Sequence, residues 1–395
     1  MSQPAAGGGF EPPAYPYDRL DGARRLAAAL EGGVVDLSVG TPTDPPPPAV
    51  LAALAEPDDA SGSARGYPAS IGSVAFREAV AKWTASRLGA TVGADSLAAC
   101  IGTKEFVATT PQWMKLRRPD RDTVLYPAVS YPTYEMGAVL AGLRAVPVPV
   151  DDGWRIDLSA VSEEEAARAL MLWVNTPGNP AGGLDDLEAA AAWGLRHGVP
   201  VFSDECYAEF TWDGPPRTIL GHGGGPDGLD GVIAVHSLSK RSNLAGLRVG
   251  WYAGDPDLVH YLREVRKHAG FMVPGPLQRA AVVALADQEH VEAQRSRYTG
   301  RLRRMADVLG AVGAPAPQPG GGFYLWVPVP AGRGDEWAFT EWLAAHGGML
   351  VSPGSFYGPA GAGYVRVAVV APDSALELVA RRLGAQSPGA QRPGA

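Results

Sequence analysis

Cysteine, long apolar runs and blocks of like charge are all scarce in this chain of 395 residues. Its two cysteines, Cys100 and Cys206, are too few for a disulfide framework, so we expect a reduced, cytoplasmic protein in which both are small buried side chains. Residues 2–16 contain neither a basic nor an apolar segment, and we therefore expect no secretory signal peptide. No stretch approaches the length of a membrane span, so we expect no membrane partner.

Positive charge is also in the minority, with 34 Lys and Arg against 42 Asp and Glu and a formal net charge of −8. An acidic surface repels nucleic acid and anionic lipid, so we expect neither as a partner. Hydrophobic residues make up 46% of the chain, which is too many for a disordered protein. The length exceeds what one small core supports and predicts two domains.

Short apolar runs alternate with helical patterns over the first two thirds of the chain, as in βαβ units. Several runs lack the strict alternation of a half-exposed strand, which predicts strands buried on both faces by helices. We expect an α/β domain over residues 50–270, with a mostly parallel sheet between helices. Its expected strands are 97–101, 123–126, 144–150, 170–174, 199–203, 231–236 and 248–253, with helices at 73–88, 105–116 and 185–196.

A smaller α+β domain is expected over residues 271–385, including a linking helix. Its expected elements are helices at 291–312, 336–346 and 374–383 and strands at 323–327, 349–351 and 364–369. Residues 1–49 are expected to start disordered and then to join this domain or a dimer interface. The Gly/Pro-rich residues 386–395 are predicted to be a flexible tail.

Four polar segments each follow an expected strand, where open α/β sheets bind their ligands. They are GTKE at 102–105, NTPGNPAGG at 175–183, SDECY at 203–207 and SLSKRSNLAGLRVG at 237–250. Together they offer what pyridoxal 5′-phosphate (PLP) requires. That cofactor needs a lysine for its aldehyde, a carboxylate for its pyridine nitrogen, donors for its phenolate oxygen and a cradle for its phosphate.

Lys240 is the predicted Schiff-base lysine. A nearby cation and partial burial would lower its pKa and favour the reactive neutral amine. Ser237, Ser239 and Arg248 lie close in the sequence and supply partners for a phosphate. A lone lysine in a polar loop is usually solvated, so this interpretation depends on the other three segments.

Asp204 ends an apolar run, where a carboxylate either caps a helix or serves a function. Opposite a pyridine nitrogen it would keep that nitrogen protonated and make the ring an electron sink. Tyr207, three residues further on, can donate to the phenolate oxygen, and Asn179 can do so from the other side. Taken alone, an Asn-Pro pair is usually a turn.

Gly102, Thr103 and Lys104 open an expected helix, whose free backbone N–H groups form an anion site. An ordinary helix cap would fit the same residues. Arg366 lies inside an apolar strand pattern, YVRVAVV, where burial is costly unless the side chain binds an anion. Its planar guanidinium suits the α-carboxylate of a substrate. We expect no metal ion at the site.

With these motifs in the same order, residues 36–382 resemble the fold-type I, class I/II aminotransferases. The chain is similar to their S-x-S-K…R-x-G, D-x-x-Y and N-P-x-G motifs, with Ala181 where Thr is commoner, a change we expect to be harmless. The resemblance implies the PLP-dependent transferase fold of type I, PLP as cofactor and a homodimer. It also implies that Tyr131 stacks on the ring, that Tyr67 reaches the phosphate across the dimer interface and that Gly40 lies near the substrate carboxylate.

Phrases such as YPYDRL, RKHAGFMVP and GSFYGP resemble, more narrowly, the actinobacterial N-succinyldiaminopimelate aminotransferases. This implies glutamate as amino donor and a keto-acid acceptor in lysine and diaminopimelate synthesis. An aspartate or broader aminotransferase, a PLP lyase or decarboxylase, and a ligand-sensing regulator remain alternatives. The regulator is disfavoured because no helix-turn-helix pattern precedes the motifs. Arg266, Lys267 and His268 could meet a second carboxylate, but a solvated helix end fits them better.

Overall fold

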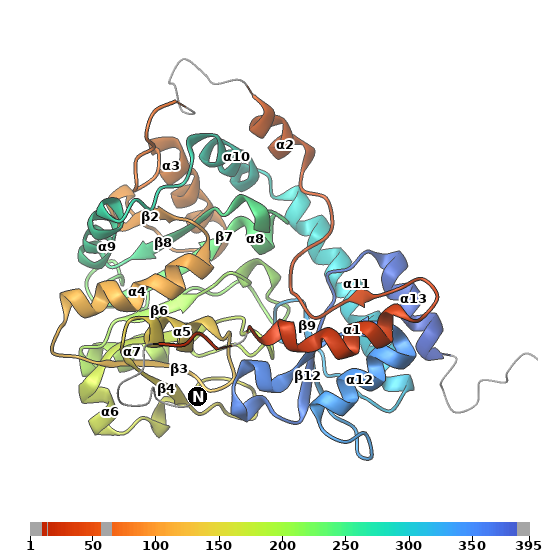
Figure 1. Cartoon of the computed structure of the whole chain (residues 1–395). Coiled ribbons are helices and arrows are strands. Elements are labelled where there is room, and N and C mark those ends of the chain that lie inside the picture. The colour runs from red at the N-terminus through yellow and green to blue at the C-terminus, as the bar shows by residue number, and fades with distance from the viewer. Residues whose placement is uncertain (1–9, 14, 57–64, 385–395) are drawn as a thin grey trace, which may run out of the picture.

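The computed structural model describes residues 10–13, 15–56 and 65–384, so the expected disordered start and the expected tail at 386–395 fall largely or wholly outside the described residues. A seven-stranded sheet forms the larger part of the molecule (Figure 1), in the order β2-β8-β7-β6-β5-β3-β4. Its strands are β2 (Leu97–Cys100), β3 (Thr123–Pro127), β4 (Arg144–Val148), β5 (Ala169–Asn175), β6 (Val201–Asp204), β7 (Val232–Ser237) and β8 (Gly250–Gly254).

One strand of this sheet runs against the others. Strands β3 to β7 pair in parallel, whereas β8 pairs antiparallel with both β7 and β2. The carboxyl ends of β2, β5, β6 and β7 therefore lie at one edge, and the amino end of β8 lies at that same edge. The mostly parallel sheet predicted from the sequence is confirmed.

Helices cover both faces of the sheet, because successive strand residues enter two different cores. In β7, Val232 and Ala234 join the core formed with α3 (Val74–Trp83), α7 (Leu187–His197) and α10 (Gly275–Ala286). Ile233 and Val235 join the core formed with α4 (Thr103–Arg117), α5 (Thr133–Leu140) and α9 (Pro256–His268). Both faces are thus apolar, which explains the continuous apolar runs in the sequence.

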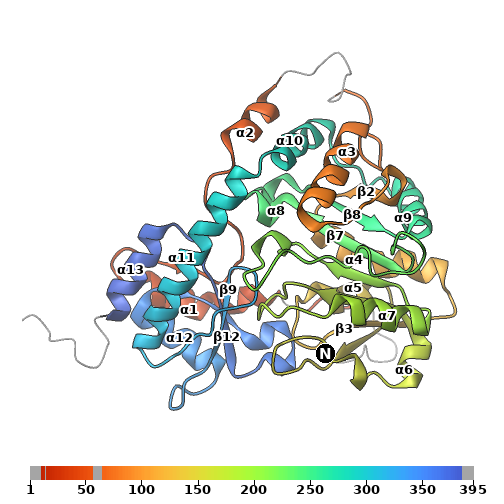
Figure 2. The same ribbon diagram turned by 180° about the vertical axis from the view of Figure 1, so that it is seen from behind.

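The smaller part contains an antiparallel sheet with the order β11-β12-β9. The elements of this smaller part are α11 (Glu289–Ala311), β9 (Tyr324–Pro328), α12 (Glu336–Gly347), β10 (Met349–Leu350), β11 (Ser352–Pro353), β12 (Tyr364–Ala368) and α13 (Asp373–Gly384). Strand β1 (Val35–Asp36) pairs in parallel with β10, and α1 (Asp21–Ala28) packs on α12. The long helix α11 runs from the end of α10 into this part (Figure 2).

Local sequence signals explain several helix boundaries. The side chain of Asp186 accepts the N–H of Ala189 at the start of α7, and Gly198 ends that helix in a left-handed conformation (φ 60°). Asp255 caps α9 in the same way. The remaining α-helices of the described residues are α2 (Pro48–Ala55), α6 (Glu163–Arg168) and α8 (Leu238–Arg241). No helix in the described ranges is long and apolar enough to cross a membrane.

Candidate active site

The shared sheet edge brings the four sequence segments together. The thiol of Cys206 donates to Thr103 Oγ1 at 3.1 Å, linking the SDECY and GTKE segments. Arg248 Nη2 donates to the carbonyl of Ile101 at 3.4 Å. Strand β8 runs antiparallel to its neighbours. Arg248, which lies just before β8, is therefore at the same edge of the sheet as the residues that follow β2, β6 and β7.

Lys240 is held by a very short helix at this edge. Helix α8 has four residues, and Ser237 caps it by accepting the N–H of Ser239 at 2.9 Å. The Lys240 amine donates to the carbonyl of Gly40 and lies 5.7 Å from the Phe323 ring centroid. Burial lowers the pKa of Lys240 to about 8, and no carboxylate of the described residues pairs with it. A substantial neutral fraction of the amine therefore exists near neutral pH.

Asp204 is a buried carboxylate without a cationic partner among the residues that the structure describes. Its Oδ2 accepts the hydroxyl of Tyr134 at 2.9 Å, and its Oδ1 accepts the backbone N–H of Cys206 at 3.2 Å. Burial raises the pKa of Asp204 against these two hydrogen bonds. Within the described ranges, no Lys, Arg or His side chain lies at ion-pair distance from it. A protonated ring nitrogen would supply the missing positive charge, so the residue fits PLP.

Two tyrosine hydroxyls meet beside the lysine. The hydroxyls of Tyr207 and Tyr324 lie 2.8 Å apart, and burial raises the pKa of both, so both stay protonated. A Cβ on Gly40 would stand 1.9 Å from the Tyr324 hydroxyl. Only glycine therefore lets this stretch of backbone approach the lysine and the tyrosines.

The start of α4 and Arg248 form a close-fitting cationic corner. Gly102 has φ 72°, and a Cβ added to it would lie 2.5 Å from Arg248 Nη2. Arg248 itself has φ 57° and donates to the carbonyl of Ala245 at 2.9 Å. Free N–H groups at a helix start beside a guanidinium fit the phosphate of PLP.

Arg366 is a buried guanidinium with no carboxylate partner among the described residues. Only 2% of it is exposed, and its Nη1 donates to Asn179 Oδ1 at 2.8 Å. Its Nη2 donates to the Ser38 carbonyl and to the Tyr17 hydroxyl, the latter at 3.3 Å. Its Nε has no hydrogen-bond partner, and the group lies 4.2 Å above the Tyr324 ring. A buried charge of this kind requires an anion, which a substrate carboxylate would provide.

Comparison with known proteins identifies the family. Residues 32–383 match the model of the family "Aminotransferase class I and II". This chain belongs to the class I and II aminotransferases. It is therefore a PLP-dependent aminotransferase, and the predicted fold, enzyme class and cofactor are confirmed.

Individual proteins are similar to this aminotransferase over nearly the whole length of the chain. A 4-dedimethylamino-4-oxo-anhydrotetracycline transaminase, OxyQ of Streptomyces rimosus, is 41% identical over 94% of this chain and 99% of its own length. The "probable aminotransferase Rv1178" of Mycobacterium tuberculosis is 42% identical over 96% of this chain and 87% of its own. A "probable N-succinyldiaminopimelate aminotransferase" of Thermus thermophilus has a similar structure, with a TM-score of 0.82, 32% identity and coverage of 93% and 98% of the two chains.

Lys104 is exposed in the first turn of α4, and Tyr131 lies two residues before α5. The Lys104 amine lies 5.4 Å from the Tyr15 ring centroid and 6.0 Å from that of Tyr131. Tyr15 in turn lies 5.5 Å from the ring of Tyr17, whose hydroxyl contacts Arg366. Lys104 forms no ion pair within the described ranges. The rings of Tyr15 and Tyr17 therefore form a row between two cationic side chains, Lys104 and Arg366. Neither cation has a carboxylate partner among the described residues.

Several residues of the site were not found from the sequence. Tyr134, Tyr324 and Tyr17 each bond to a predicted site residue. All three lie in phrases that carry the family resemblance, namely YPYDRL for Tyr17, YPTYEMGA for Tyr134 and YLWV for Tyr324. The local sequence assigned none of their hydroxyls a role.

The interpretation of Arg266 as part of a solvated helix end is wrong. Its guanidinium is buried and binds both Glu105 oxygens at 2.7 Å. Glu105 Oε2 also accepts the N–H of Ile101, so this ion pair secures the start of α4. The expectation for Cys206 also needs correction. It is only partly buried, and its thiol contacts Thr103, whereas Cys100 is buried as expected.

Tyr67 is fully exposed and takes no part in the site of a single chain. Its predicted phosphate contact requires a second subunit, and the dimer stays a prediction. We expect light scattering to show at least a dimer, and Tyr67→Phe to weaken PLP binding by about tenfold through loss of one hydrogen bond to a charged group. An active monomer, or unchanged PLP affinity in Tyr67→Phe, would contradict this role. Tyr261→Phe, which removes a tyrosine hydroxyl outside the site that donates to the carbonyl of Trp113 at 2.7 Å, is the control for PLP affinity.

Proposed function

We propose that this aminotransferase moves the amino group of glutamate to N-succinyl-2-amino-6-ketopimelate, in the cytoplasmic synthesis of lysine and diaminopimelate. The observation that carries this proposal is the pair of cations, Arg366 and Lys104, at the two ends of the row of aromatic rings. Glutamate and this acceptor both carry a distal carboxylate as well as an α-carboxylate. The resemblance in YPYDRL, RKHAGFMVP and GSFYGP, and the likeness to the Thermus thermophilus structure, support the same substrate.

In this proposal each residue of the site has its own role in the reaction. When bound, PLP supplies the electron sink that makes the substrate Cα–H acidic. Arg366 holds the α-carboxylate bidentately and thereby turns the Cα–H toward Lys240. With the cofactor bound, the Lys240 amine would be the base that takes the proton from the substrate Cα and the acid that returns it. Asp204 keeps the pyridine nitrogen protonated, which sustains the electron sink throughout.

Other side chains bind rather than move protons. With PLP bound, Tyr207 and Asn179 would donate to its phenolate oxygen, and the ring of Tyr131 would lie against its pyridine ring. Gly102, Thr103, Ser237, Ser239 and Arg248 hold the phosphate. Gly40 leaves room for the substrate carboxylate beside Tyr324, because a side chain there would collide with that hydroxyl.

A comparison of acceptors tests the substrate. With glutamate as donor, we expect the highest kcat/KM for N-succinyl-2-amino-6-ketopimelate within a panel that also contains oxaloacetate, an aromatic keto acid and a polycyclic ketone. The panel includes the last because of the tetracycline substrate of OxyQ. A preference for any other acceptor by more than about 100-fold, roughly 2.7 kcal/mol, would overturn the proposed substrate. The aminotransferase assignment would survive that result.

A variant of Lys104 tests the distal carboxylate separately. We expect Lys104→Gln to lower kcat/KM about 10- to 100-fold for acceptors with a distal carboxylate, because one charge-assisted hydrogen bond is lost. Pyruvate, which has no distal group, should be used equally well by both proteins. Lys82→Gln, on the exposed face of α3, is the control. Equal losses for all acceptors, with weaker PLP binding, would instead assign Lys104 to the phosphate.

A further inference from the structure

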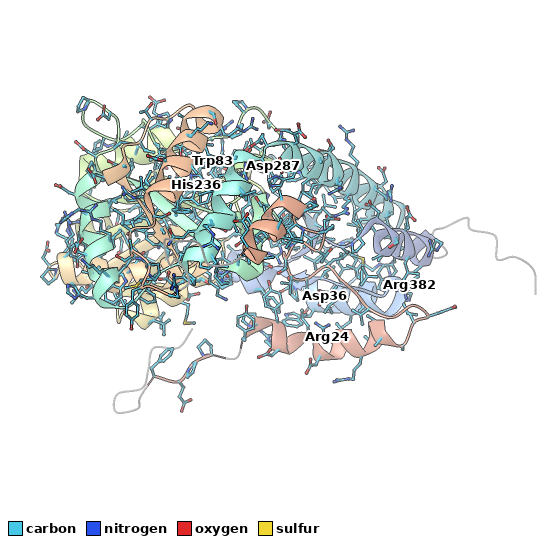
Figure 3. All side chains as sticks on the ribbon, turned by 90° about the horizontal axis from the view of Figure 1, so that it is seen from above. Arg24, Asp36, Trp83, His236, Asp287 and Arg382 are labelled. Atoms are coloured by element: carbon cyan, nitrogen blue, oxygen red, sulfur yellow. The ribbon has the colours of Figure 1, made fainter. Side chains whose placement is uncertain are left out.

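A buried polar network joins Arg241 of α8 to Glu209 of the short helix Ala208–Phe210. The side chains of Glu209 and Arg241 are 3% and 2% exposed, and Arg241 Nε lies 3.2 Å from Glu209 Oε1. The same oxygen accepts the indole N–H of Trp83 at 2.8 Å. The other oxygen accepts from Arg87 Nη2 at 3.2 Å and from Gln288 Nε2 at 3.4 Å. Figure 3 labels Trp83, whose indole N–H donates to Glu209, and Asp287, whose carbonyl accepts from Arg241.

Every nitrogen of Arg241 has a partner. Its Nη1 donates to the carbonyl of Ala284 at 2.6 Å and to Ser242 Oγ at 3.1 Å. Its Nη2 donates to Gln288 Oε1 at 3.1 Å and to the carbonyl of Asp287 at 3.4 Å. Ala284 and Asp287 lie at the carboxyl end of α10, where helix carbonyls lack partners of their own. A planar guanidinium can satisfy these groups together, whereas an ammonium group cannot.

The position of this pair in the sequence connects the two halves of the site. Glu209 belongs to the short helix that directly follows Tyr207, in the segment that carries Asp204. Arg241 directly follows Lys240. A helix of four residues has little stability of its own, so its direction depends on what holds it. We propose that Arg241, through Glu209 and the end of α10, is a positioning residue that holds the Lys240 amine at its working distance from the Asp204–Tyr207 segment.

A gain in folding stability alone does not explain why the buried ion pair of Glu209 and Arg241 is present. Removing two charges from water costs about as much as their attraction returns, and apolar side chains of the same volume often serve equally well. A fully hydrogen-bonded guanidinium does fix geometry, and a displacement of about 1 Å at a reacting group can cost about 100-fold in rate. The inference rests on the proposed role of Lys240 and concerns what places that amine.

The test compares Arg241→Lys with Arg87→Lys. Both changes keep the positive charge and a partner of Glu209, but among these hydrogen bonds only those of Arg241 reach α8 and the end of α10. For Arg241→Lys we expect kcat to fall about 10- to 100-fold, equivalent to about 1.4–2.7 kcal/mol, while KM for glutamate changes by less than about threefold. Covalent uptake of PLP by the apoenzyme, followed by absorbance, should slow by a similar factor. Arg87→Lys should leave both rates within about twofold.

The outcomes separate this inference from the proposed role of Lys240. Borohydride reduction and peptide mapping of the wild-type holoenzyme first show which lysine carries PLP. A link at another lysine overturns the role of Lys240 and this inference with it. A link at Lys240, with Arg241→Lys within twofold of wild type or with equal losses in both variants, overturns the positioning role alone. If Arg241→Lys does not fold, Glu209→Gln takes its place, with the same expected and contradicting results.

Discussion

Lys240→Ala is expected to give a folded protein that forms no borohydride-reducible link to PLP and turns over at least about 10⁴-fold more slowly than wild type. The side chain supplies both the covalent attachment and the base that moves the substrate proton, and no second amine can take over either task from the same place. Mass spectrometry of the reduced, digested protein measures the link. Lys267→Ala, which removes a lysine that is 60% exposed on α9, is the control. Recovery of PLP on a different lysine would contradict the assignment.

The lowered pKa of Lys240 also predicts how the rate of covalent PLP uptake depends on pH. The neutral amine reacts with an aldehyde, and burial lowers the pKa of Lys240 to about 8. The neutral fraction, and with it the rate of covalent PLP uptake by the apoenzyme, should fall about tenfold for each pH unit below 8 and level off above it. An ordinary lysine would continue to gain rate up to about pH 10. A profile that rises through pH 9 without levelling would therefore show that the amine is not desolvated.

Asp204→Asn is expected to slow turnover by about 10³-fold or more, roughly 4 kcal/mol, while PLP can still bind. An amide cannot hold a proton on the pyridine nitrogen, so the ring loses most of its capacity as an electron sink. The N–H of Cys206 can still bond to the amide oxygen, and the amide N–H can donate to the Tyr134 hydroxyl oxygen, so the fold should persist. Single-turnover kinetics with glutamate and the absorbance of the bound cofactor measure the two effects.

Asp255 offers a matched control for Asp204, because both carboxylates stand at the end of an apolar strand. The side chain of Asp255 accepts the N–H groups of Leu258 at 2.9 Å and of Gly231 at 2.7 Å. It follows β8, whose reversed direction places it at the opposite edge of the sheet from the site. Asp255→Asn should lower the free energy of unfolding by about 1 kcal/mol and leave turnover within about twofold. Near-normal turnover in Asp204→Asn would mean that Asp204 also serves only as a cap or a core residue.

Local patterns in the sequence predicted the seven strands of the larger sheet, and they indicated the groups that PLP would require. The apolar runs at 170–174 and 231–236 predicted buried strands, because a strand covered on both faces needs no polar positions. The segments with Lys240 and Asp204 could be found because their residue types are close in the sequence and cofactor chemistry requires them together. Tyr134, Tyr324 and Arg266 could not be found in this way. Arg266 binds a carboxylate 161 positions away, and its neighbours in sequence describe only a helix end.

The sequence by itself thus determined the fold class and the enzyme family, and it predicted which segments bind the cofactor. Strand order and direction were decided only by the tertiary structure, and they placed Arg248 with Gly102 and Asp255 at the far edge. The packing of the smaller part against the sheet likewise brought Arg366 to Asn179, 187 positions away, and Tyr324 to Tyr207. The physical reason is that periodicity and motif spacing act over a few residues. Contacts between distant segments depend on how whole faces of the sheet and helices bury their apolar surface, and a local pattern does not specify which faces meet.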